Sequence, residues 1–134
     1  MGLIAQGPRK RILVVEDDDT SARMVRDYLE AHGYDISVAA NGNEGLERFR
    51  SEHPDLMIVD VALPKKSGFD LCIDVKQTEH GRTMPVLLMS AVFRGGETTG
   101  TYPRDGMGPE AMLAKPFDLS VLLRRVQQLL GRAA

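Results

Sequence analysis

A short apolar run, Leu56 to Val59, sets the class of fold that this chain can adopt. It is rich in β-branched residues, lies between Pro54 and Pro64, and is followed directly by Asp60. An unbroken apolar run of this length is typical of a strand that a parallel sheet buries on both faces. Ligands of such sheets bind outside the carboxyl ends of the strands, so Asp60 is either a turn residue or a functional group.

Similar runs recur along the chain and alternate with segments of helical periodicity. We predict strands at residues 11–15, 34–39, 56–60, 85–89 and 110–114. We predict helices at about 21–32, 43–52 and 68–77, a loop at 81–84, and a final helix that Asp118 caps and Gly131 stops. Strands that alternate with helices predict an α/β fold with a doubly wound, five-stranded parallel sheet and right-handed crossovers.

The stretch from Phe93 to Gly108 interrupts this alternation, because it carries five glycines and a proline. Each glycine disfavours a helix interior by about 1 kcal/mol relative to alanine, and a proline by about 3 kcal/mol. We therefore predict an atypical, irregular segment at 94–108, where strict alternation would place the fourth helix.

The composition is that of an ordinary globular domain. The chain has 134 residues, 43% hydrophobic and 27% charged, with a formal net charge of -2, which does not favour direct binding of nucleic acid. No apolar run is long enough for membrane insertion or a signal peptide. Cys72 is the only cysteine, which excludes an internal disulfide, fits a cytoplasmic location and predicts a core residue. We assign 1–10 to an N-terminal extension, 11–131 to the domain and 132–134 to a C-terminal tail.

Four consecutive acids, Glu16 to Asp19, follow the first predicted strand. Part of this run is explained by the next helix, because Asp19 or Thr20 can cap its N-terminus. Glu16 and Asp17 precede the cap and are not explained in this way. We therefore assign these two acids to a site.

Polar groups stand at the carboxyl ends of the other predicted strands as well. Asp60 ends the third strand, Ser90 follows the fourth and Lys115 follows the fifth, so all are expected to share one sheet edge with the two acids. Clustered carboxylates need a cation, and few carboxylates with room for water suit Mg2+, whereas histidine and cysteine ligands for zinc are absent from these ends. A hydroxyl and an ammonium can hold a phosphoryl group there, and a carboxylate can act as the nucleophile.

Four motifs carry these residues: ILVVED at 12–17, IVDVALPKKSG at 58–68, LMSA at 88–91 and AKPF at 114–117. In this order and spacing they resemble the receiver domain of two-component response regulators, over about residues 11–130. The resemblance implies a (βα)5, flavodoxin-like fold. It also implies that Asp60 accepts a phosphoryl group from a sensor histidine kinase or phosphotransfer protein and that this changes binding to a downstream protein, whose identity the sequence does not indicate.

The resemblance implies a ligand set for Mg2+ in this reaction. Asp17, Asp60 and the Ala62 carbonyl are implied to bind the metal directly, and Glu16 is implied to bind it through water. The domain is implied to be a signalling phosphoacceptor that promotes its own phosphorylation and dephosphorylation.

The resemblance also implies how the phosphoryl group is held and sensed. Ser90 is implied to hydrogen-bond the phosphoryl oxygens. Lys115, aimed by a cis Lys115–Pro116 bond, is implied to pair with Asp60 and then with the phosphoryl group. Met112 stands three places before Lys115, where many receivers carry an aromatic residue that swings inward, and is the implied switch partner of Ser90. A flexible thioether packs adaptably, which makes it a poor two-position switch.

Two other functions fit part of this pattern. A receiver-like interaction module would bind partners without phosphorylation, but every residue that phosphorylation needs is present. A Mg2+-dependent phosphatase with an aspartyl nucleophile would carry a second aspartate where this chain has Ala62, so no general acid is visible. We expect a stand-alone receiver or a piece of a longer protein.

Overall fold

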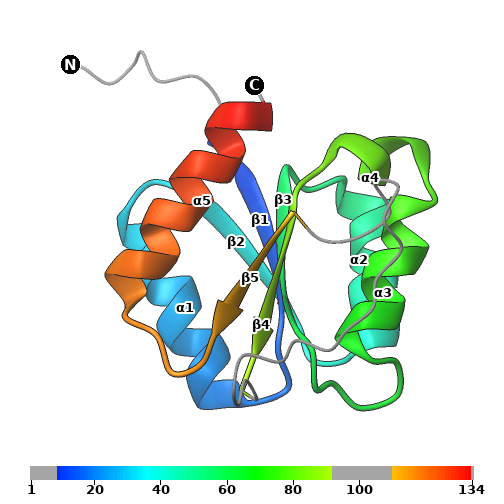
Figure 1. Cartoon of the computed structure of the whole chain (residues 1–134), viewed down its shortest axis with the longest axis horizontal. Coiled ribbons are helices and arrows are strands. Elements are labelled where there is room, and N and C mark those ends of the chain that lie inside the picture. Colours follow the sequence, from blue (N-terminus) through cyan, green and yellow to red (C-terminus); the bar gives the residue numbers. More distant parts are fainter. Residues whose placement is uncertain (1–8, 92–109, 134) are drawn as a thin grey trace.

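The computed structural model of the chain describes residues 9–91 and 110–133 (Figure 1). The described part forms one parallel sheet of five strands in the order β2-β1-β3-β4-β5. The strands are β1 (Arg11–Val15), β2 (Asp35–Ala39), β3 (Leu56–Asp60), β4 (Val86–Ser90) and β5 (Ala111–Ala114). The predicted α/β fold with a parallel sheet is confirmed. The glycine-rich segment at 94–108, predicted to be irregular, lies outside the described residues.

Helices cover both faces of this sheet (Figure 1). α1 (Asp19–Ala31) and α5 (Leu119–Ala133) lie on one face, and α2 (Gly42–Glu52), α3 (Gly68–Lys76) and the short α4 (Glu79–Thr83) lie on the other. β3 is the central strand, and all of its residues are buried. The apolar run that precedes Asp60 is thus buried on both faces, as predicted.

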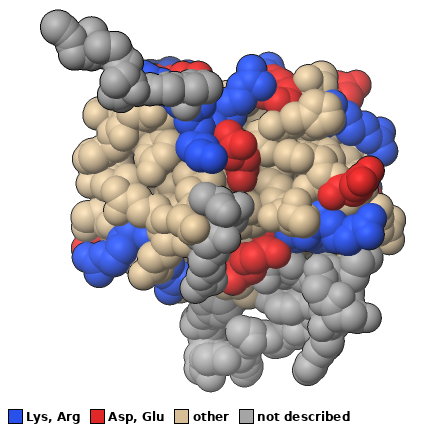
Figure 2. Space-filling view, turned by 90° about the horizontal axis from the view of Figure 1, so that it is seen from above, with Lys and Arg blue, Asp and Glu red and all other residues tan. Residues whose placement is uncertain are grey.

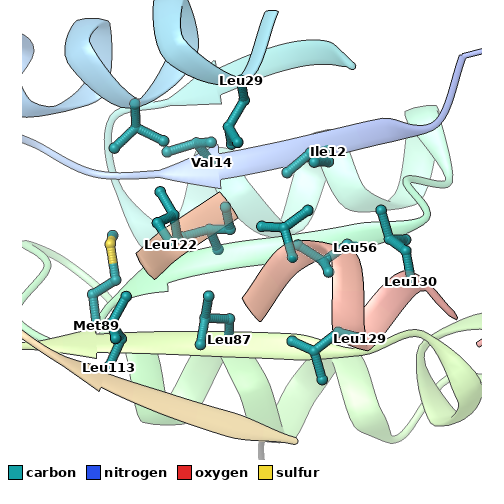
Figure 3. Packing of buried hydrophobic residues seen from close by; sticks show 13 residues of the cluster. Ile12, Val14, Leu29, Leu56, Leu87, Met89, Leu113, Leu122, Leu129 and Leu130 are labelled. Atoms are coloured by element: carbon teal, nitrogen blue, oxygen red, sulfur yellow. The ribbon is translucent and has the colours of Figure 1, made fainter. Parts of the chain in front are cut away.

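Each face of the sheet carries its own apolar core, because successive side chains of a strand point to opposite faces. Leu56 and Ile58 join the cluster under α1 and α5, which Figure 3 shows. Met57 and Val59 join the cluster under α2 and α3, which also holds Cys72, as predicted. Fully burying one large apolar side chain contributes about 1.5–3 kcal/mol, so the two cores together fix β3 and the acid at its end.

The first helix is capped by a residue other than the predicted one. Asp18 is the N-cap, because its carboxylate accepts a hydrogen bond from the Ser21 N–H at 2.9 Å. The prediction that Asp19 or Thr20 caps this helix is wrong, since both residues already lie in its first turn. Acids at the start of a helix also interact favourably with the positive end of its macrodipole.

A short helix, α4, occupies most of the segment that was predicted to be a loop at 81–84. Thr78 is its N-cap and accepts a hydrogen bond from the Gly81 N–H at 2.9 Å. A Cβ at Gly81 would collide with the Val75 carbonyl of α3. Gly81 lets α4 start directly against the end of α3, so the prediction of a loop is wrong.

The last helix continues past Gly131 to Ala133, so the prediction that Gly131 stops it is wrong. One glycine costs a helix only about 1 kcal/mol. Leu129 and Leu130 are buried in the core just before it and hold the last turns in place. A helix that is anchored in this way propagates through a single poor residue.

The surface carries both signs of charge. Figure 2 views the edge of the sheet at which the strands begin, and there Lys and Arg side chains are interspersed with Asp and Glu, in keeping with the net charge of -2. Across the described residues, every helix is too short or too polar to cross a lipid bilayer.

Candidate functional site

The carboxyl ends of β1 and β3 bring three acids together. Glu16 and Asp17 directly follow β1, and Asp60 is the last residue of β3, which pairs with β1. One carboxylate oxygen of each acid lies within 4.8 Å of the other two. Glu16 and Asp60 are 4% and 6% exposed, whereas Asp17 is an exposed residue. The sheet therefore assembles the acidic cluster that the strand ends predict.

Lys115 supplies a positive charge to this cluster. Its backbone N–H donates to the Ser90 carbonyl at 2.8 Å, which continues the pairing of β4 with β5. Its Nζ donates to Glu16 Oε1 at 3.1 Å and to Asp60 Oδ2 at 3.4 Å. The Lys115–Pro116 bond is cis, as predicted. The ammonium thus bridges acids from two different strands, and its ion pair with Glu16 was not predicted.

Backbone amides hold the remaining oxygens of the same two acids. Glu16 Oε2 accepts from the Asp18 N–H at 3.1 Å, and Asp60 Oδ1 accepts from the Ala62 N–H at 3.3 Å. Each buried carboxylate therefore has one oxygen on Lys115 and the other on the backbone just after its own strand. The two backbone amides fix the orientation of both carboxylates without ordering a further side chain, which would cost rotamer entropy.

Burial and charge act on the titration of this site in opposite directions. Burial raises the pKa of the Glu16 carboxyl above its ordinary value, although the Asp18 amide and Lys115 oppose this rise. Burial by itself lowers the pKa of Lys115, but the hydrogen bond and charge of Glu16, and then those of Asp60, outweigh it and raise that pKa. The ammonium form of Lys115 is therefore stabilised against deprotonation by the acids that it bridges.

Gly68 shapes the site and was not among the predicted site residues. It is the first residue of α3, and its N–H donates to the Val61 carbonyl at 2.9 Å. A Cβ at this position would collide with the Asp60 carbonyl. The available signal in the sequence was a glycine at the start of an apolar helix, where its helix propensity is poor.

The loop between β3 and α3 is held in a strained conformation. Lys65 has a φ of 70°, in the left-handed region that disfavours side chains by about 1–2 kcal/mol. Lys66 Nζ lies 2.6 Å from Asp74 Oδ2, which ties the loop to α3. On its other side the backbone of Lys66 lies against Gly42, at the start of α2. Strain of this kind persists only where the surroundings impose it.

The two predicted switch residues lie on neighbouring strands. Ser90, half-buried, ends β4 and pairs with Ala114, while Met112 pairs with Leu88 further back along the strand. Met112 is half-buried and packs against the core under α2 and α3. The structure therefore places Ser90 at the edge that carries Asp60 and places Met112 behind it. Their switching role stays a prediction.

An apolar cavity of about 510 Å3 opens beside the acids, between α1 and the segment that joins β5 to α5. Met24, Val25, Phe117 and Leu119 contribute apolar walls, and Glu16 also lines it. Met24 is 53% exposed, which is unusual for a large apolar side chain in the described residues. The cavity gives access to the acidic cluster from the α1 side.

Comparison with protein families agrees with this geometry. The sequence profile described as "Response regulator receiver domain" matches residues 12–127. The chain belongs to the response regulator receiver family. The resemblance that the four motifs carry is thereby confirmed, and this chain is a receiver domain of the two-component response regulators, a family of signalling phosphoacceptors.

Two relatives of similar identity differ in how much of their length this chain matches. The receiver is 32% identical over 124 residues to the polar-differentiation response regulator DivK of Brucella ovis, which covers 92% of this chain and 98% of DivK. It is 34% identical over 122 residues to the DNA-binding dual master transcriptional regulator RpaA of Synechocystis, which covers 91% of this chain and 49% of RpaA. The chain thus spans about half the length of RpaA and nearly all of DivK.

Solved receivers share its fold. The chemotaxis response regulator CheY4 of Vibrio cholerae superposes with a TM-score of 0.82 at 25% identity, over 91% of this chain and 99% of CheY4. The receiver domain of the Francisella response regulator 1452 superposes with a TM-score of 0.81 at 26% identity, over 94% of this chain and 100% of that domain. The sheet with helices on both faces is therefore the CheY-like, flavodoxin-like arrangement.

Proposed function

We propose that this receiver accepts a phosphoryl group on Asp60 in a Mg2+-dependent reaction. The observation that best supports the proposal is the pairing of the buried Asp60 carboxylate with the Lys115 ammonium at 3.4 Å, inside a cluster of three acids. A buried carboxylate needs a cation partner. The ammonium that pairs with the carboxylate can also donate hydrogen bonds to phosphoryl oxygens. The phosphodonor is the phosphohistidine of a sensor histidine kinase or of a phosphotransfer protein.

The donor set at this edge suits Mg2+. Asp17 and Asp60 would hold the ion directly with the Ala62 carbonyl, and Glu16 would hold it through water. These are hard oxygen donors, few in number, and Asp17 is exposed, so room remains for the water and phosphate oxygens that Mg2+ retains. When bound, the ion neutralises negative charge on the transferring phosphoryl group.

In the transfer step, an Asp60 carboxylate oxygen attacks the phosphorus of the phosphohistidine. The new O–P bond forms as the P–N bond breaks, and the electron pair of that bond leaves on the donor imidazole. Lys115 passes from Asp60 to one phosphoryl oxygen, and the Ser90 hydroxyl donates to another. Because these groups stand at strand ends fixed by the core, they can hold the reacting atoms in line. The acyl phosphate, sensed by Ser90 and Met112, then changes binding to a downstream protein.

An interaction module that works without phosphorylation is not favoured. Such a module has no need for Lys115 to bridge Glu16 and Asp60 or for backbone amides to orient both carboxylates. A phosphatase is not favoured either, because Ala62 offers no general acid.

The decisive experiment treats the protein with acetyl phosphate and Mg2+ and follows the intact mass. We expect the wild type to gain one phosphoryl group and Asp60→Asn to gain none. The control Asp35→Asn should be labelled like the wild type, because Asp35 is an exposed residue at the start of β2, away from the carboxyl ends of the strands. Equal labelling of Asp60→Asn and the wild type would refute the proposal. Omitting Mg2+ should abolish labelling in every sample.

A further inference from the structure

An ion pair between a buried lysine and an exposed glutamate, at the start of β5, takes no part in the proposed chemistry. Lys76, the last residue of α3, is 0% exposed. Its Nζ donates to the Met84 carbonyl at 2.6 Å and to Glu110 Oε2 at 2.8 Å. An ammonium is tolerated in a protein interior only with such acceptors. The pair lies where β5 begins, whereas Lys115 follows the residue where β5 ends (Figure 1).

Glu110 is held through its side chain and its backbone at once. Its Oε1 accepts from the Val86 N–H at 2.7 Å, and its own N–H donates to the Val86 carbonyl at 2.9 Å. Val86 is the first residue of β4, so both of its backbone polar groups are engaged by one residue of the neighbouring chain segment. With Lys76, Glu110 therefore ties together the end of α3, the start of β4 and the entry to β5.

The register of β5 needs such a device. β5 has only four residues and is an edge strand beside β4. Only Leu113 of its four residues is buried, so packing against the core gives few contacts that specify the register of β5. A slip of one residue would turn Leu113 out of the core and change the position of Lys115. The two hydrogen bonds between Glu110 and Val86 therefore specify which residue of β5 pairs with which residue of β4.

We propose that the Lys76–Glu110 pair is a positioning device for Lys115: it fixes β5 on β4 and so delivers the ammonium to Asp60. This inference rests on the proposed role of Asp60 as phosphoacceptor. A slip of one residue moves a strand by about 3.3 Å. That is as large as the whole distance of 3.4 Å between Lys115 Nζ and Asp60 Oδ2, so the ion pair would be lost.

Three variants of the full chain test this device. Glu110→Ala removes every side-chain contact of Glu110. Lys76→Met removes the ion pair but leaves both hydrogen bonds between Glu110 and Val86. Val75→Ala is the matched control, because Val75 is also fully buried on α3 and its truncation removes core packing but none of the hydrogen bonds of Glu110. The readouts are the rate of phosphorylation by acetyl phosphate per folded molecule, the Mg2+ affinity, and the amide chemical shifts of Ser90 and Lys115 without a phosphodonor.

We expect phosphorylation of Glu110→Ala to slow on the order of tenfold or more, that of Lys76→Met to slow less, and that of Val75→Ala to stay near the wild-type rate. Mg2+ affinity should not fall, because the implied metal ligands stand on β1 and β3. Glu110→Ala should add no further slowing in a Lys115→Gln background, since both changes remove the same ammonium.

Wild-type rates in folded Glu110→Ala and Lys76→Met would overturn the inference, and so would equal slowing in Val75→Ala. A wild-type protein that takes up no phosphoryl group would instead contradict the proposed function. In that case the positioning role is still tested by the amide chemical shifts. Unchanged Ser90 and Lys115 signals in Glu110→Ala or Lys76→Met would overturn it.

Discussion

Lys115 Nζ lies 3.4 Å from Asp60 Oδ2, although the two residues are 55 positions apart in the chain. The same ammonium lies 3.1 Å from Glu16 Oε1. Buried acids need a cation nearby, and Lys115 supplies one to both Glu16 and Asp60. A divalent ion would be held by the same acids. The ammonium and the metal would therefore neutralise the same negative charge, so a change at Lys115 should alter the affinity for Mg2+.

The first prediction concerns this shared charge. Replacing Lys115 by glutamine should raise the affinity for Mg2+ while slowing phosphorylation of Asp60, since the cluster becomes more negative and the phosphoryl group loses its ammonium. The free energy of unfolding without metal should fall by about 2 kcal/mol, the scale of a hydrogen bond to a charged group. Metal titration measures the Mg2+ affinity, intact mass after acetyl phosphate measures the phosphorylation rate, and chemical denaturation measures the free energy of unfolding. The control is Lys66→Gln, whose ion pair lies outside the cluster; weaker Mg2+ binding by Lys115→Gln than by this control would contradict the argument.

The second prediction separates three consecutive acids. Asp17→Ala should lose most of its Mg2+ affinity, because Asp17 belongs to the cluster of three carboxylates. Asp18→Ala should bind Mg2+ better than Asp17→Ala but be less stable than the wild type, because Asp18 caps α1. Asp19→Ala should change both quantities least. A larger loss of Mg2+ affinity in Asp19→Ala than in Asp17→Ala would show that the assignment of the metal ligands is wrong.

The third prediction concerns the only cysteine. Burial raises the pKa of Cys72 from its ordinary value of 9.0 to about 12. At a pH between these two pKa values, the Cys72 thiol keeps its proton in the folded protein and releases it in the unfolded chain. The free energy of unfolding therefore falls as the pH rises through this range. The stability advantage of the wild type over Cys72→Ala should be smaller by roughly 1 kcal/mol at pH 10 than at pH 8. Urea denaturation of both proteins at the two pH values measures it; a constant difference would mean that the thiol titrates alike in both states.

The fourth prediction tests the strain in the loop after β3. Lys65→Gly should raise the free energy of unfolding by about 0.5–1 kcal/mol, because glycine adopts a positive φ without steric cost but loses more chain entropy on folding. Lys65→Ala is the matched control, since it removes the charged side chain and keeps the Cβ, and it should leave stability nearly unchanged. Equal stabilisation by both variants would attribute the effect to the lysine charge and not to the backbone.

Local patterns in the sequence determined the architecture and the identity of the candidate site. Leu56 to Val59 is apolar at every position, so burial on both faces follows from a handful of neighbouring residues, and Asp60 is placed at a strand end by the same run. The strand-end rule then brings Glu16 and Asp17 to the same edge without knowledge of any contact. These inferences hold because they depend on periodicity and on a rule about sheet edges.

Only the tertiary structure decided how these residues are paired. Glu16 and Lys115 are 99 positions apart and Lys76 and Glu110 are 34 apart, and nothing local in either segment specifies its partner. The segment predicted as a loop at 81–84 shows the same limit, because most of it is helical and Gly81 lies close against the Val75 carbonyl of α3. Side-chain partners are selected when the sheet sets its register and the helices dock on it, and these long-range events are decided by packing of the whole domain.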